Sequence, residues 1–153
     1  MAGAGLITIR GHHLLCMLGF RGHGYTVLFT GNLERIITQL ARSADLRIVL
    51  TASCDAICAA CPHMDGDICA KPGGSGPAVV ALDEAVLDRI EMAAGDCATV
   101  SGVYERVAQS VDVDEIGTRL CVGCEWLDVG FCTSGLARLK SSGSPFDGRW
   151  NAS

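Results

Sequence analysis

Two cysteine triplets with the same spacing are the first residues in this sequence that could do chemistry. The first contains Cys58, Cys61 and Cys69, and the second contains Cys121, Cys124 and Cys132, so that each reads C-x2-C-x7-C. A C-x2-C turn lets two thiolates converge on one metal, and the third cysteine returns after a short excursion that contains Gly66 or Gly130. Each triplet is one thiolate short of a four-cysteine site, and together they predict metal binding.

The ligand arithmetic favours an iron–sulfur cluster over zinc. Zinc usually takes four closed ligands, which Cys58 and Cys61 could form with Cys121 and Cys124, but Cys69 and Cys132 would then be left over. A 4Fe–4S cubane can take three thiolates from one loop and a fourth ligand from elsewhere. We therefore predict one or two 4Fe–4S clusters, with zinc as the alternative.

Either the other cysteines supply the missing ligand or one coordination position stays open, and a histidine-rich segment favours Cys16 as the ligand. If this segment is helical, His12 and His13 precede Cys16 by four and three positions and share one edge with it. Cys16 is our first choice for the additional ligand, and Cys54 is a further candidate. Cys97 stands alone after a predicted helix and is expected to be inert.

The two histidines have several possible roles at this stage. His12 or His13 could ligate the metal, act as an acid or base beside it, or hydrogen-bond to a sulfur. They could equally be helix-start residues that bond only to backbone. Trp126 is expected to pack over the site, and we interpret four acidic residues as solvated loop carboxylates: Asp55, Asp65, Asp67 and Glu125.

Composition narrows the class of protein. With 153 residues and 49% of them hydrophobic, the chain can bury one core. A net charge of −5 gives no indication of nucleic-acid or anionic-membrane binding, and no 18-residue apolar run predicts a membrane span. Nine cysteines is an odd number, and no export signal precedes them. These features predict a reduced, cytoplasmic protein.

The elements that position these residues follow from hydrophobic patterning. Strands are predicted at 6–9 and 47–51, and helices at 12–20, 83–94, 102–110, 114–120 and near Leu136, with a further helix that begins after Asn32 as N-cap. Residues 54–78 look irregular, and the turn-rich stretch 71–77 is expected to be a mobile loop. We predict a single α+β domain over residues 1–140, mostly helical with a short sheet and two cysteine-rich metal-binding loops. A flexible tail over residues 141–153 is expected to follow.

In combination, these motifs resemble a known family. The matching segments are residues 10–16, 19–25, 32–34, 57–62 with Cys69, and 121–126 with Cys132. The sequence resembles domain-of-unknown-function family 1284, a group of bacterial and archaeal proteins of which some are labelled iron–sulfur binding. The resemblance implies a cytoplasmic cysteine-rich domain with a cluster and no assigned reaction.

The predicted function is that of an iron–sulfur protein. A cluster bound by only three cysteines leaves one iron open as a Lewis acid, which suits sulfur transfer, desulfuration or a lyase reaction on a small molecule. His12 or His13 would then be the acid or base. The alternatives are an electron carrier with a redox partner protein and a structural zinc module.

Overall fold

Three short segments from distant parts of the chain form a small mixed sheet. Its strands are β1 (Ile7–Arg10), β2 (Arg47–Thr51) and β5 (Cys97–Thr99). β2 lies in the middle, parallel to β1 and antiparallel to β5, with Ile7 opposite Ile48. Ile48 and Leu50 alternate with more exposed residues and are fully buried, so one face of β2 packs against the core.

The computed structural model describes most of the chain, with several gaps. It covers residues 6–20, 27–42, 46–53, 55, 57, 64–65, 68–69, 76–115, 131–143 and 145–146. Side chains are not described at 64–65, 68–69, 76–78, 115, 131 and 132. Within these residues, no helix combines the length and the hydrophobicity that crossing a membrane requires.

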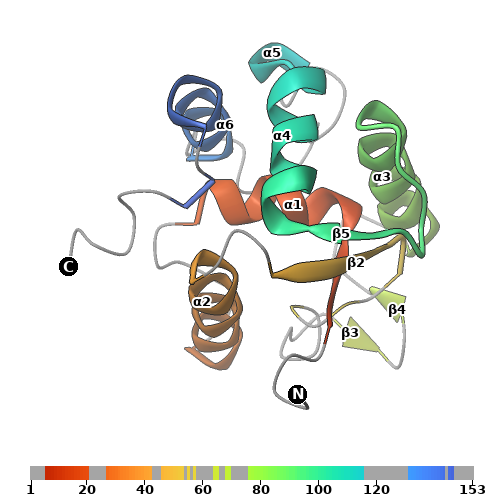
Figure 1. Cartoon of the computed structure of the whole chain (residues 1–153). Coiled ribbons are helices and arrows are strands. Elements are labelled where there is room, and N and C mark those ends of the chain that lie inside the picture. Colours follow the sequence, from red (N-terminus) through yellow and green to blue (C-terminus); the bar gives the residue numbers. More distant parts are fainter. Residues whose placement is uncertain are drawn as a thin grey trace.

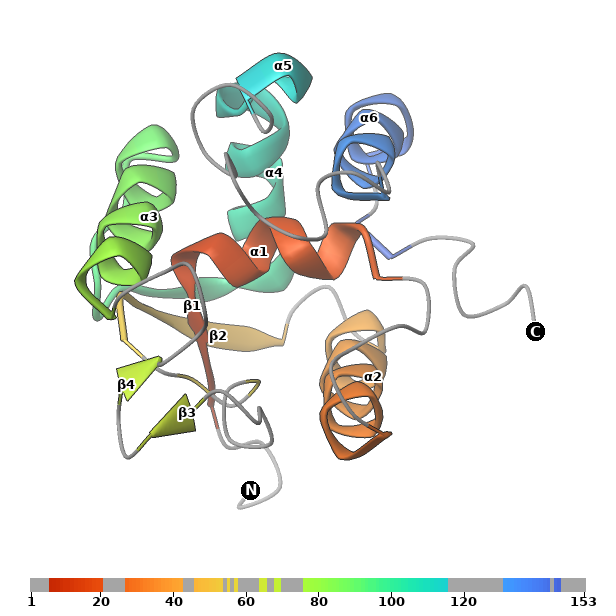
Figure 2. The same cartoon turned by 180° about the vertical axis from the view of Figure 1, so that it is seen from behind.

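The helices surround one central helix. They are α1 (Gly11–Leu18), α2 (Val27–Ala41), α3 (Gly76–Arg89), α4 (Val100–Ser110), the single turn α5 (Val113–Glu115) and α6 (Phe131–Ser142). α1 follows β1 without a loop and crosses the middle of the molecule (Figure 1). Seen from either side, α3 lies near the start of α1 and α6 near its end (Figure 2).

Two glycines allow these helices to approach α1 closely. A Cβ placed on Gly11 would collide with the backbone of Asp83 in α3, and a Cβ on Gly135 in α6 would collide with the backbone at Leu18. Only glycine avoids these contacts, because it has no Cβ. Both ends of α1 are thus fixed at backbone distance from a neighbouring helix.

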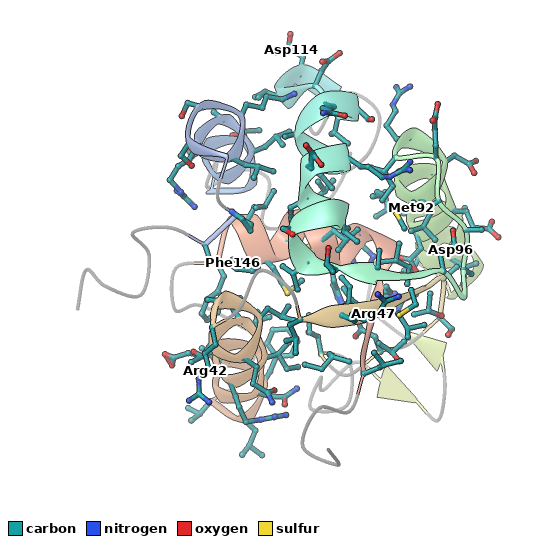
Figure 3. The ribbon with its side chains drawn as sticks, in the orientation of Figure 1. Arg42, Arg47, Met92, Asp96, Asp114 and Phe146 are labelled. Atoms are coloured by element: carbon teal, nitrogen blue, oxygen red, sulfur yellow. The ribbon has the colours of Figure 1, made fainter. Side chains whose placement is uncertain are left out.

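The core around α1 is apolar and includes residues close to the end of the described chain. Leu14, Leu15 and Leu18 are fully buried, as the helical pattern predicts. The Tyr104 hydroxyl in α4 donates a hydrogen bond to the Leu14 carbonyl at 2.8 Å. Phe146, labelled in Figure 3, packs edge-on against Tyr104 with 5.5 Å between ring centroids. The packed core therefore extends past α6.

The α+β class is confirmed, and so is the strand predicted at 47–51. The start predicted for α2 is wrong, because the helix already includes Val27 and continues through Asn32. The Asn32 side chain accepts a hydrogen bond from Arg35 at 2.7 Å inside the helix and does not act as an N-cap. Polar caps and polar surface residues of a helix look alike in sequence, which explains the error.

The bounds of α3 also differ from the prediction. The helix begins at Gly76, so Gly76 and Pro77 belong to its first turn and not to a loop. Proline suits this position because its fixed φ is helical and its missing N–H has no helical partner there. The helix ends at Arg89, well before Gly95, because the chain must turn to pair with β2, where the Gly95 N–H donates to the Leu50 carbonyl at 2.7 Å.

A short hairpin lies within the first cysteine triplet. β3 (Met64–Asp65) and β4 (Ile68–Cys69) pair antiparallel, with Met64 opposite Cys69. The chain therefore reverses between residues 65 and 68, where the sequence places Gly66. The predicted helix at 114–120 is seen only as α5, since residues 116–120 lie outside the described part, as does most of the predicted tail.

Candidate functional site

The open edge of α1 carries the three residues that the sequence singled out. Among the residues of this helix, only His12, His13 and Cys16 have partly exposed side chains, and the others are buried. The exposed fractions of the His12 and His13 side chains are 18% and 13%. We refer to these three residues as the histidine edge, and its helical geometry agrees with the predicted i, i+3 and i+4 arrangement.

A buried carboxylate from α3 holds His12. Oδ1 of Asp83 accepts hydrogen bonds from His12 Nδ1 at 2.6 Å and from the His12 backbone N–H at 3.0 Å. Oδ2 of Asp83 accepts from both Nε and Nη2 of Arg10 at 2.7 Å. Asp83 is fully buried and Arg10 is 2% exposed, so the ion pair and the histidine form one desolvated network.

A second carboxylate holds His13. Oδ2 of Asp55 accepts from His13 Nδ1 at 2.9 Å and from the Arg10 backbone N–H at 2.8 Å. Its Oδ1 accepts from the Ile57 backbone N–H at 2.9 Å. The prediction that Asp55 is solvated is wrong, because its side chain is completely buried at the start of α1.

These carboxylates also cap α1. The first N–H groups of a helix lack helical partners and attract negative charge, and no side chain of the local sequence caps this end. Asp55 and Asp83 accept from N–H groups there instead. The capping brings a carboxylate to each imidazole, and the two rings lie side by side with centroids 4.4 Å apart.

Burial makes His12 a neutral imidazole. Desolvation, and next the charge of nearby His13, lower the pKa of His12 from 6.5 to about 4, although the hydrogen bond and charge of Asp83 oppose this. Because a carboxylate only accepts, the proton of the neutral ring is assigned to Nδ1. Nε2 then carries a lone pair that can bind a metal or accept a proton.

The lowered pKa predicts a loss of stability in mild acid. An unfolded His12 binds a proton with a pKa of 6.5 and the folded one with a pKa of about 4, so protons favour the unfolded state between these values. The His12 contribution is complete above pH 6.5 and is lost as the pH falls toward 4, by up to about 3 kcal/mol. Urea unfolding at several pH values measures it.

The control for this prediction is His12→Gln, which cannot titrate. Stability is compared between pH 7 and 4.5, where the other titrating groups are the same in both proteins and their contributions largely cancel. The variant should show a flatter pH profile than the wild type over this window. Equal slopes for the two proteins would contradict the prediction.

Only some of the predicted metal ligands lie among the residues that the structure describes. Within them, no three histidine, cysteine or acidic side chains lie close enough to hold a metal ion. Five candidates lie outside the described residues: Cys54, Cys58, Cys61, Cys121 and Cys124. Cys69 ends β4 and Cys132 is the second residue of α6, both with backbone alone described. A centre that includes the histidine edge would have to draw its other ligands from these cysteines.

Of the other residues that the sequence analysis named, the structure describes some and leaves others out. Cys97 lies in β5 opposite Val49, partly buried and in no disulfide, and Cys16 is in no disulfide either. Trp126 and Glu125 lie outside the described residues.

Sequence reasoning missed Asp83, although a signal was present. Asp83 precedes Val86, Leu87 and Ile90 by three, four and seven positions, which is the apolar stripe of its helix. A carboxylate on such a stripe is buried and needs partners. Arg10 and His12 supply them.

Fold and site together define a small α+β domain whose central helix presents two carboxylate-backed histidines and a cysteine. A family model described as "Protein of unknown function (DUF1284)" matches residues 24–130, more than half of the chain. The chain belongs to this family, as the resemblance indicated. The matched region contains Cys58, Cys61, Cys69, Cys121 and Cys124, but neither the histidine edge nor Cys132. No curated protein and no solved structure matches the chain.

Proposed function

We propose that this protein binds a 4Fe–4S cluster at the histidine edge and uses it in catalysis. The observation that carries the proposal is that α1 exposes only His12, His13 and Cys16, and that both imidazoles are backed by buried carboxylates. Metal-binding histidines characteristically donate their other ring N–H to a carboxylate. The remaining ligands would be Cys54 and cysteines of the two triplets.

The donors fit such a cofactor. Imidazole nitrogen and thiolate sulfur are suitable ligands for iron and for zinc. The paired C-x2-C-x7-C triplets favour a cluster, because a single zinc ion would leave cysteines over. Zinc in a structural module is the competing candidate.

Asp55 supports a centre that joins the histidine edge to the first triplet. Its side chain accepts hydrogen bonds from His13 and from the backbone N–H of Ile57. Cys58, the first cysteine of the triplet, directly follows Ile57 in the sequence. Consecutive Cα atoms are about 3.8 Å apart, so the triplet starts next to a residue fixed by this network. The β3–β4 hairpin then brings Cys69 back opposite Met64.

The histidines favour an enzyme over an electron carrier. When bound, a cluster with one iron not ligated by protein supplies a Lewis acid for sulfur transfer, desulfuration or elimination from a small molecule. The imidazole of His13 can act as the acid or base, and Asp55 holds its ring in place. An electron carrier needs no acid or base.

Metal analysis of the anaerobically purified protein tests this proposal. We expect about four iron and four sulfide per cluster and no stoichiometric zinc. Loss of an outer-shell partner typically weakens metal binding by about 10- to 100-fold, and the loss of a ligand should cost at least as much. Cys16→Ala should therefore retain iron at least about tenfold more weakly in a chelator titration.

Cys97→Ala is the matched control, since Cys97 lies in the sheet and is predicted to be inert. Its iron content and visible spectrum should equal those of the wild type. Stoichiometric zinc without iron would contradict the proposal and favour the zinc module. Unchanged iron binding in Cys16→Ala would remove Cys16 from the ligands.

A further inference from the structure

His12 is anchored to Asp83 through both its backbone and its ring. One carboxylate oxygen, Asp83 Oδ1, bonds to its backbone N–H and to its ring Nδ1. The other oxygen of Asp83 is bound twice by Arg10, which ends β1. Strand, central helix and α3 thus fix the position of one imidazole.

The free nitrogen of this ring faces away from the carboxylate. Nδ1 and Nε2 lie on different sides of an imidazole, so a ring anchored through Nδ1 presents Nε2 on its other side. Among the described residues, Nε2 of His12 has no hydrogen-bond partner. The His12 side chain as a whole is 18% exposed, so part of the ring reaches the surface.

Cys16 lies one helical turn from His12. Side chains at i and i+4 of a helix share a face, with about 5–6 Å between their Cβ atoms. Leu14, Leu15 and Met17 between and beside them are fully buried, so this face is the only open part of α1. Paired ligands at i and i+4 are a common way for a helix to hold a metal.

We propose that Nε2 of His12 directly ligates iron of the centre, together with Cys16 Sγ, and that Asp83 is its positioning residue. This inference rests on the proposed function and adds a nitrogen ligand to it. His12 is favoured over His13 because Asp83 binds both its backbone N–H and its Nδ1, whereas Asp55 binds only the Nδ1 of His13. Exchange of a cysteine for histidine also raises the reduction potential of iron–sulfur centres.

Pulsed electron paramagnetic resonance of the reduced protein tests the inference, because a ligating imidazole gives a nitrogen hyperfine coupling that thiolates do not. The coupling should be present in the wild type and change as expected when the histidines are labelled with ¹⁵N. It should be lost in His12→Gln and retained in the matched control His13→Gln. Iron and sulfide content are measured on the same samples.

The outcomes separate the two proposals. A protein without iron overturns both, whereas a reduced cluster without histidine nitrogen coupling overturns only the ligand assignment. Coupling that survives in folded His12→Gln also overturns it. If His12→Gln does not fold, the chain's three other histidines are replaced one at a time, as His13→Gln, His23→Gln and His63→Gln. Coupling that is retained in all three variants supports His12 as the ligand. Loss of the coupling in any one of them overturns His12.

Discussion

Asp83→Asn should destabilise the protein by about 3–5 kcal/mol, because it removes the carboxylate charge that pairs with the buried guanidinium of Arg10. Asp83 is fully buried, and its two oxygens accept from Arg10 and from His12. Domains of this size are typically stable by about 5–15 kcal/mol, so the loss is a large part of the total. Urea denaturation of the metal-free protein at pH 7 measures it.

Asp88→Asn makes the same chemical change in the same helix at an exposed position. It should alter stability by no more than about 0.5 kcal/mol. The proposed role of Asp83 as a positioning residue is tested by a separate measurement. If the Asp83→Asn variant folds, it should also lose the His12 nitrogen hyperfine coupling. Equal stability of the Asp83→Asn and Asp88→Asn variants would show that the Arg10 charge is compensated elsewhere.

Gly11→Ala should cost about 2–3 kcal/mol, at the upper end of the usual effect of overpacking. The added Cβ would lie 3.0 Å from the Asp83 Cα and carbonyl carbon and closer still to its oxygen. These are backbone atoms of a packed helix, which cannot rotate away as a side chain would. The thermal midpoint should fall accordingly, and the His12–Asp83 contact should be displaced.

Gly31→Ala is the control, because it measures the higher helix propensity of alanine without a steric clash. Gly31 is exposed inside α2, and a Cβ placed there meets no atom within 4 Å. This substitution should stabilise the protein by about 0.5–1 kcal/mol, because alanine is the better helix former. If Gly11→Ala leaves the stability of the protein unchanged or raises it, α1 and α3 can move apart without loss of stability, which contradicts the prediction.

Local patterning predicted the elements better than their ends. The apolar repeat of Leu33, Ile36 and Leu40 indicated α2 correctly, but Asn32 could not be distinguished from a cap. Gly76 and Pro77 look like loop residues in sequence, yet α3 begins with them and packs against α1 farther along. Helix ends depend on such neighbours, which a linear pattern does not contain.

The candidate site was predictable only along α1. The spacing of His12, His13 and Cys16 fixes their common edge once the segment is helical. Their carboxylates are separated from them by 42 and 71 residues, and no local spacing can indicate contacts of that range. Asp55 even lies in a segment that reads as solvated loop. The pairing follows from the way α3 and the segment after β2 meet the start of α1.

The composition of the core bears on whether the protein folds before or after it binds the proposed cluster. The buried apolar residues around α1 include no cysteine within the described part of the chain. The described contacts that place His12 and His13 come from this scaffold and from two aspartates, and none of them involves a cysteine. We therefore expect the scaffold to fold before the proposed cluster is loaded, unlike small zinc domains that are unfolded without their ion. A chain that loses the proposed cluster to oxidants should then be loaded again without unfolding.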